Sequence, residues 1–331
     1  MKIQRREVLL GALAAGLGTT VSNRATSSEK AETLTGGPSQ PAETIDLWPG
    51  EAPGMPALTL TQTVTERSTD VNILDRAVTG ITRPRLAIIR PTVPNGAAIM
   101  LIPGGGYERV TIDKEGFEPG NWFSERGYTV FVLIYRLPGD GWAAGPDVAL
   151  SDAQRAIRLV RNNNHVYDVD PDRLAVMGFS AGGHLCADLV TRYAAPTYEP
   201  VDDADSLSAR PSLAALIYPV ISMSLPVAHA RSRELLIGKD AGPALESAHS
   251  PQNNVPAGAS PCFLVHAEDD PSVPVENALE FRAALLARGI PVETHLFARG
   301  GHGFGMSGVV GMPAAAWPEL FLGWSTSHGL I

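Results

Sequence analysis

Five apolar runs, each short enough to be a single strand, determine most of what this chain can fold into. They carry few charges along their length, as do strands that are buried on both faces of a parallel sheet. The runs occupy residues 97–103, 128–137, 173–179, 213–220 and 262–267. They therefore predict the centre of a mostly parallel sheet.

The segments around these runs complete the pattern. Further strands are predicted at residues 59–67, 71–77, 86–90 and 292–298. Helices are predicted at residues 116–126, 147–163, 181–193, 275–288 and 314–325, and residues 221–260 as loops and short helices. Strands that alternate with helices predict an α/β fold, with a mostly parallel sheet of about eight strands flanked by helices and no large lid.

Composition narrows the functional class. The chain has 331 residues and a formal net charge of -9, which argues against a nucleic-acid-binding protein, because such proteins usually carry a basic patch or stripe. Its two cysteines, Cys186 and Cys262, match no zinc spacing and are too few for a disulfide framework. Both are expected to be small buried residues.

The N-terminus resembles an export signal. Arg5 and Arg6 precede an apolar run at residues 8–18, which is shorter than the roughly 20 residues that span a bilayer. The paired arginines resemble a twin-arginine (Tat) signal, although the cleavage site is poorly defined and a basic start without a targeting role is the alternative. We predict a signal peptide at 1–25, a disordered linker at 26–44 and a single domain at 45–331. The protein would then be periplasmic or secreted, without a stable membrane span.

One short motif suggests chemistry. VMGFSAGGHL, residues 176–185, places Ser180 between two glycines where a predicted strand meets a predicted helix. In this context G-x-S-x-G is typical of a nucleophile elbow, a turn so sharp that Cβ atoms at Gly178 and Gly182 would crowd the backbone. The alternative is a serine that merely fits a tight turn. A nucleophilic serine needs a base and an acid elsewhere in the chain.

The later sequence offers both partners in the order that the elbow predicts, acid before histidine. The strand at 262–267 runs into Glu268, Asp269 and Asp270. Asp270 is the preferred acid because its D-x-x-V-P spacing resembles the acid loop of many α/β-hydrolases, with Asp269 left open; helix capping is the alternative role for the cluster. His302 follows within GGHGFG, where flanking glycines would let a loop present the imidazole to Ser180.

An early glycine-rich segment fits the oxyanion hole. IPGGGY, residues 102–107, follows a predicted strand in the place of the HGGG-type motif of esterases, with Pro103 where that motif has histidine. We predict backbone donors at Gly105, Gly106 and Ala181. A phosphate-binding loop is the alternative, but no Lys-Ser/Thr pair or G-x-G-x-x-G match follows. Neither a metal nor an organic cofactor is expected.

With these parts in place, the sequence resembles an α/β-hydrolase and, more narrowly, the bacterial carbohydrate esterases related to acetyl xylan esterases. The resemblance spans about residues 45–325 and rests on LWPGEAPG, PGGGY, YRLP, DAQRAIRLVR, VMGFSAGGHL, VHAEDDPSVPVENAL and HLFARGGHGFG. It implies deacetylation of a small-molecule or polysaccharide ester such as xylan or a xylo-oligosaccharide. The residue spacing alone implies only acyl hydrolysis.

Four residues are candidates for substrate contacts: Tyr107 after the glycines, Glu115 and Trp142 in loops after strands, and His184 one helical turn after Ser180. Packing is the alternative for His184, and a loop anchor for Trp142. His229 and Arg233 could form a pocket wall or a solvated face.

Three other functions compete with the carbohydrate esterase. A serine peptidase of the same fold usually adds a propeller domain, for which about 300 residues leave no room. A general carboxylesterase would use the same residues. A non-catalytic binding protein would lack a member of the triad, and none is missing.

Overall fold

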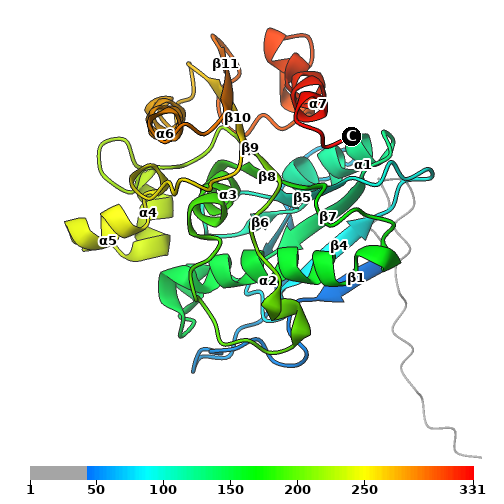
Figure 1. The fold of residues 1–331 in the computed structure, drawn as a ribbon. Coiled ribbons are helices and arrows are strands. Elements are labelled where there is room, and N and C mark those ends of the chain that lie inside the picture. Colours follow the sequence, from blue (N-terminus) through cyan, green and yellow to red (C-terminus); the bar gives the residue numbers. More distant parts are fainter. Residues whose placement is uncertain (1–42) are drawn as a thin grey trace, which may run out of the picture. The chain divides into compact units, whose positions relative to one another are not determined.

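The apolar runs form the centre of one mostly parallel sheet (Figure 1). The computed structural model describes residues 43–331. The strands of this sheet are β1 (Glu43–Asp46), β4 (Arg85–Ile89), β5 (Ala98–Ile102), β7 (Thr129–Ile134), β8 (Leu174–Phe179), β9 (Leu213–Ile217), β10 (Cys262–Ala267) and β11 (Val292–Phe297). Their order is β1-β4-β7-β5-β8-β9-β10-β11, with β1–β4 and β4–β7 antiparallel and the other pairs parallel. The predicted fold class is confirmed.

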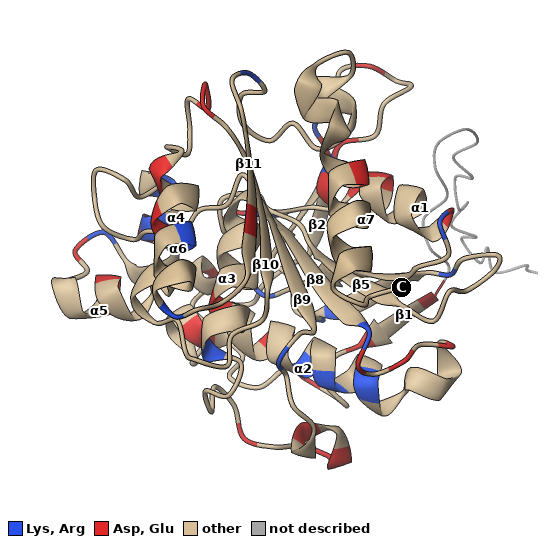
Figure 2. Cartoon of the chain, turned by 45° about the horizontal axis from the view of Figure 1, so that its top comes forward, with Lys and Arg blue, Asp and Glu red and all other residues tan. Residues whose placement is uncertain are grey.

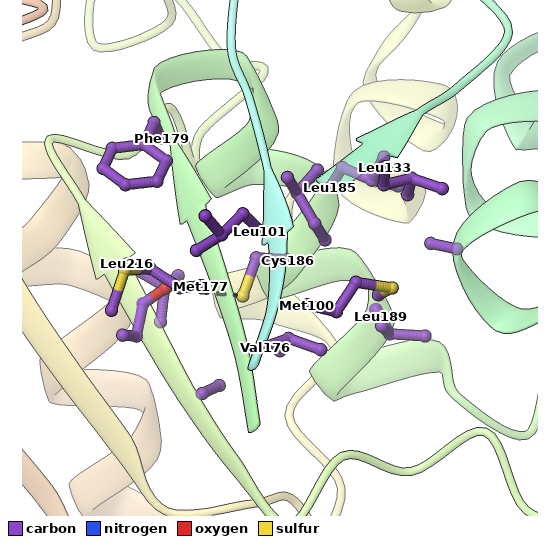
Figure 3. Packing of buried hydrophobic residues seen from close by; sticks show 14 of the residues in the cluster. Met100, Leu101, Leu133, Val176, Met177, Phe179, Leu185, Cys186, Leu189 and Leu216 are labelled. Carbon is purple, nitrogen blue, oxygen red and sulfur yellow. Dashed lines mark hydrogen bonds between the residues drawn. The ribbon is translucent and has the colours of Figure 1, made fainter. Parts of the chain in front are cut away.

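The central strands are buried on both faces, as their unbroken apolar sequences require. Figure 3 shows Leu101 of β5, Met177 of β8 and Leu216 of β9 within the buried cluster, together with Leu185 and Cys186 of the following helix. Both cysteines are free and buried, as predicted. This rigid centre holds the carboxyl ends of β5, β8 and β10 in register.

Helices cover both faces of the sheet. They are α1 (Glu118–Ser124), α2 (Val148–Asn162), α3 (Ser180–Arg192), α6 (Glu276–Ala287) and α7 (Trp317–Ser327). Successive residues of β8 show the two faces: a Cβ on Gly178 would lie 2.6 Å from Cys186 Cβ on α3, whereas the Phe179 ring contacts Trp317 of α7. On the α7 face, Phe123 of α1 and Phe321 of α7 pack edge to face.

The arginines of α2 stabilise the fold through contacts with the loop that precedes β9. Figure 2 shows α2 as a helix with several basic bands. Arg155 is buried and pairs with Asp202 and Asp205, while Arg158 and Arg161 donate to the carbonyls of Leu207 and Ser208 respectively. The basic row therefore fastens the loop that precedes β9.

The N-terminal strands differ from prediction. The segments predicted at 59–67 and 71–77 contribute only β2 (Thr63–Glu66) and β3 (Arg76–Thr79), which join β6 (Val110–Thr111) in a separate three-stranded sheet. β1 was not predicted and begins at Glu43, slightly before the expected start of the domain. The predicted signal peptide and nearly all of the linker lie outside the described residues.

Residues 221–260 contain two short helices, α4 (Ala230–Ile237) and α5 (Pro243–Ala248), as the sequence predicts. Among residues 43–331, no helix is both long enough and apolar enough to cross a membrane.

Candidate active site

The elbow around Ser180 has the predicted geometry. β8 ends at Phe179 and α3 begins at Ser180, whose φ of 52° lies in the left-handed region. A Cβ on Gly178 would collide with the Gly182 carbonyl, a Cβ on Gly182 would collide with the Ile102 carbonyl, and one on Gly183 would come within 2.8 Å of Pro219 Cβ. Only glycine fits at these positions, so the motif is required by the turn itself.

Ser180, His302 and Asp270 form one hydrogen-bonded chain. Ser180 Oγ lies 2.8 Å from His302 Nε2, and His302 Nδ1 lies 2.6 Å from Asp270 Oδ2. Because a carboxylate can only accept, Nδ1 carries the proton and donates it to Asp270. In the neutral ring Nε2 is therefore the acceptor for the Ser180 hydroxyl.

The structure distinguishes the two candidate acids. Asp270 Oδ1 accepts the backbone N–H groups of Ser272 and Val273 while Oδ2 faces His302. Asp269 Oδ1 instead accepts the N–H groups of Gly300 and Gly301, just before His302 in the chain. Asp270 holds the imidazole, and Asp269 holds the loop that carries it.

His266, which was not predicted as a site residue, lies next to this acid. The His266 Nε2–H donates to the Val273 carbonyl at 3.0 Å and lies 3.3 Å from Asp270 Oδ2. Burial alone would raise the pKa of Asp270, but hydrogen bonds from His266, His302 and the Val273 N–H outweigh it and hold the pKa well below its usual range. The available signal was the position of His266 four residues before Asp270.

The glycine-rich loop lines the cleft that contains Ser180. Gly105 and Gly106 have φ of 125° and 69°, and both line the same cleft as Ser180. Within residues 43–331, the N–H groups of Gly105, Gly106 and Ala181 donate to no protein acceptor. These three donors are therefore free to receive a ligand oxygen.

Glu115 supports this loop. It lies in a π-helical turn at Asp113–Phe117 and is buried. Its Oε2 accepts the Gly104 N–H at 2.8 Å and the Thr111 hydroxyl at 2.7 Å, and its Oε1 accepts the Tyr218 hydroxyl at 3.0 Å. Although Glu115 borders the cleft, its carboxylate already has three protein donors.

Tyr218 was not predicted as a site residue. Its hydroxyl also accepts the Gly305 N–H, and its ring lies 5.2 Å from the His302 ring. Tyr218 and Glu115 thus connect the loop of His302 to the glycine-rich loop. The sequence offered no spacing that would indicate this connection.

Tyr107 and His184 lie behind the glycine-rich loop and outside the cleft lining. The His184 Nε2–H donates to the His249 carbonyl at 2.8 Å, so Nδ1 accepts the Tyr107 hydroxyl at 2.7 Å. Burial lowers the pKa of His184 to about 4. Both side chains therefore pack against the protein and support the loop. For His184, this is the packing role that was predicted as the alternative to a substrate contact.

Trp142 is a loop anchor. It is buried, and the Arg136 guanidinium lies 4.8 Å from its ring centroid. Arg136 is itself paired with buried Asp152. Trp142 is not among the residues that line the cleft with Ser180.

The cleft has a volume of ≈ 460 Å³ and a strongly polar lining. Besides the residues already described, its lining includes Arg67, Asp75, Glu108, Arg109, Lys114, His229 and Arg231. Arg233 is not part of this wall: it is buried and pairs with Glu246.

His229 forms part of the wall next to Gly106. Its Nδ1 accepts the Ser232 hydroxyl at 2.8 Å and the Ser232 N–H at 3.3 Å, which caps α4. Burial lowers the pKa of His229, so the ring is neutral and its proton sits on Nε2. Across the described chain, no protein acceptor receives that Nε2–H.

The family model of BD-FAE matches residues 87–285. This chain belongs to the BD-FAE family. The matched segment contains the glycine-rich loop, Ser180 and Asp270.

Relatives and solved structures agree with that assignment. The chain is 33% identical over 228 residues to an acetylxylan esterase of Xylanibacter ruminicola, a match covering 67% of this chain and 44% of that protein. It is 32% identical to an acetyl ester-xyloside bifunctional hydrolase of Caldicellulosiruptor lactoaceticus, with a TM-score of 0.67 and coverage of 83% of this chain and 99% of that one. A carboxylesterase of Lactobacillus plantarum, 23% identical with a TM-score of 0.62 and coverage of 83% and 99%, supports the α/β-hydrolase fold alone. The chain thus spans less than half of the Xylanibacter protein.

Proposed function

We propose that this BD-FAE family member is a serine esterase that removes acetyl groups from carbohydrate, with xylan or xylo-oligosaccharides as its substrate class. The observation that carries the proposal is the hydrogen-bonded chain from Ser180 Oγ through His302 to Asp270, which opens on a cleft beside Gly105 and Gly106. Similarity to an acetylxylan esterase and an acetyl ester-xyloside hydrolase supports the acetyl group and the sugar.

In the proposed acylation step, His302 Nε2 takes the Ser180 proton as Oγ attacks the ester carbonyl carbon. The negative charge on the carbonyl oxygen is received by the N–H groups of Gly105, Gly106 and Ala181. Asp270 stabilises the imidazolium. When the ester C–O bond breaks, the Nε2–H protonates the departing sugar oxygen, which leaves as a hydroxyl, and an acetyl group remains on Ser180.

Deacylation repeats these roles with water as the nucleophile. His302 Nε2 takes a proton from the water, whose oxygen attacks the acetyl carbonyl, and the same N–H groups receive the charge. The bond from the acetyl carbon to Ser180 Oγ breaks, and the proton on Nε2 returns to Oγ. Acetate is released, and Ser180 again donates to His302.

The lining of the cleft favours a carbohydrate over a small apolar ester. Arg67, Glu108 and Arg109 give it a charged wall. Sugar hydroxyls can both donate to carboxylates and accept from guanidinium groups. A general carboxylesterase is the alternative function, and it would require more apolar lining near Ser180.

The proposal is tested by measuring acetate release from acetylated xylan by the full chain. We expect release that disappears in Ser180→Ala. Cleavage of an aminoacyl p-nitroanilide without ester hydrolysis would favour a peptidase instead. Hydrolysis of p-nitrophenyl acetate without any release from xylan would favour a general carboxylesterase.

We also propose that residues 1–25 direct export through the Tat pathway, on the strength of Arg5, Arg6 and the short apolar run. Residues 1–40 fused to a folded reporter should carry it out of the cytoplasm. Replacement of both arginines by lysine should retain it inside. A reporter that stays cytoplasmic with both arginines intact contradicts the proposal.

A further inference from the structure

A second cavity, of ≈ 510 Å³, adjoins the cleft that contains Ser180. The two cavities share Asp75 and Lys114 in their linings. The mechanism proposed above uses neither residue. The second cavity therefore adjoins the cleft of Ser180, but the proposed mechanism assigns it no function.

The second cavity is lined by both apolar and polar side chains. Ile73, Leu74 and Phe117 supply the apolar surface. The polar part of the lining includes Ser68, Asn72, Asp75, Lys114, Glu118 and Ser307. A pyranose ring has the matching character, because its C–H face is apolar and its hydroxyls point outward.

The two shared residues leave polar atoms without partners. Asp75 Oδ1 is shielded from solvent and accepts no hydrogen bond from any residue of the described chain. Its other oxygen lies 3.5 Å from Arg67. Lys114 forms no ion pair or hydrogen bond within residues 43–331. Its Nζ lies near Gly308, which also lines the second cavity: a Cβ built on Gly308 would be 3.9 Å from that nitrogen. An acceptor without a donor is costly, and the Asp75 side chain is 21% exposed, so a rotation of its carboxylate would bring Oδ1 to a ligand donor.

The balance of charge identifies the kind of ligand. Asp75 can only accept hydrogen bonds and Lys114 can only donate them. An anion would be repelled by Asp75 and Glu118, and a cation by Lys114. A hydroxyl both donates and accepts, so neighbouring hydroxyls of one neutral sugar satisfy both residues.

The segment that carries Asp75 is held in place. Glu66 Oε1 accepts the N–H groups of Arg67, Ser68 and Asp75, and the Arg67 N–H donates to the Asp75 carbonyl. These bonds close the loop at residues 67–75 at its base. Asp75 is thereby presented to the cavities by a fixed backbone, as a preorganised binding site requires.

We propose that the second cavity is a glycosyl subsite, which binds a sugar unit next to the acetylated one through Asp75, Lys114 and the apolar surface of Ile73. This proposal rests on the esterase function proposed above. It makes the preferred substrate an oligosaccharide or polymer rather than the ester of a single sugar.

The test compares two substrates, acetylated methyl xyloside with one sugar and acetylated xylotriose with three. We expect kcat/KM of the full chain to be about tenfold or more higher for xylotriose. Ile73→Asp should bring this ratio close to one, and Lys114→Met should lower it. Ile73 is 56% exposed, so its replacement leaves the core intact; Val93→Asp, at a residue 76% exposed on another loop, is the matched control and should leave the ratio unchanged.

A second measurement is independent of turnover. Unacetylated xylotriose should bind Ser180→Ala by calorimetry, and Ile73→Asp in that background should weaken binding about tenfold.

A ratio of the two kcat/KM values near one in the unmodified protein overturns the subsite, as does a ratio that Ile73→Asp leaves unaltered. Loss of naphthyl acetate hydrolysis in Ile73→Asp with the xylotriose preference intact would also overturn it, since the cavity would then hold an aromatic group. If the protein hydrolyses p-nitrophenyl acetate but shows no xylotriose preference, only the subsite fails; if it hydrolyses no ester, the esterase proposal fails.

Discussion

His302 Nδ1 lies 2.6 Å from Asp270 Oδ2, and the side chain of that aspartate is completely buried. The neighbouring carboxylate of Asp269 points instead at the backbone of Gly300 and Gly301. The two adjacent acids therefore have different roles: Asp270 orients the imidazole of His302, and Asp269 stabilises the loop that carries it.

This division predicts unequal effects of matched substitutions. Asp270→Asn should lower kcat by about 10⁴-fold, because the amide can donate to Nδ1 and so favours the wrong tautomer of His302. Asp269→Asn keeps an oxygen acceptor for the two glycines and should cost less than about tenfold. Steady-state kinetics on p-nitrophenyl acetate measures both. Equal losses would contradict the assignment of Asp270.

His229 should contact the bound ester through its free Nε2–H. Two substitutions distinguish this contact from the capping of α4. An Asn side chain places its amide near the position of the His229 Nδ1, and a Gln side chain places its amide near the position of Nε2. His229→Asn should keep the thermal stability but lower kcat/KM for an acetylated xyloside about tenfold. His229→Gln should retain more activity but lose about 1 kcal/mol of stability, because the cap is lost. If activity in both variants merely follows their thermal stability, His229 is structural only.

The buried His184 predicts a pH dependence of stability. Its pKa is about 4 in the folded protein against 6.5 ordinarily, so between these values the unfolded chain binds more protons. Stability is therefore lost as pH falls through this window. Between about pH 7 and about pH 5, the unmodified protein should lose about 2 kcal/mol more than His184→Gln. Urea unfolding at both pH values measures this difference, and equal losses would contradict it.

The sequence predicted the sheet and the candidate triad for one physical reason. Strands buried on both faces must be apolar throughout, so β5, β7, β8, β9 and β10 are recognisable without knowledge of their neighbours. Carboxyl ends of parallel strands meet at one edge of the sheet. Residues that follow those strands, such as Ser180 and Asp270, are consequently brought together.

The supporting residues could not be predicted in the same way. Glu115 resembles a substrate contact in sequence, and only the fold shows that Gly104, Thr111 and Tyr218 already occupy its carboxylate. β2 is exposed along its whole length, so its sequence carries no alternation that would fix its bounds. Its partner strand β3 lies at Arg76–Thr79, later in the chain than the predicted strand at 71–77.

In the proposed mechanism, Ser180 carries the acetyl group from the acylation step to the deacylation step. The most direct test stops the reaction with acetylated xylotriose in acid and maps the modified peptide by mass spectrometry. We expect one acetyl group on Ser180 in the unmodified protein and none in Ser180→Ala, which should also lose activity by about 10⁶-fold. Turnover that continues in Ser180→Ala, or an acetyl group found on another residue, would contradict it.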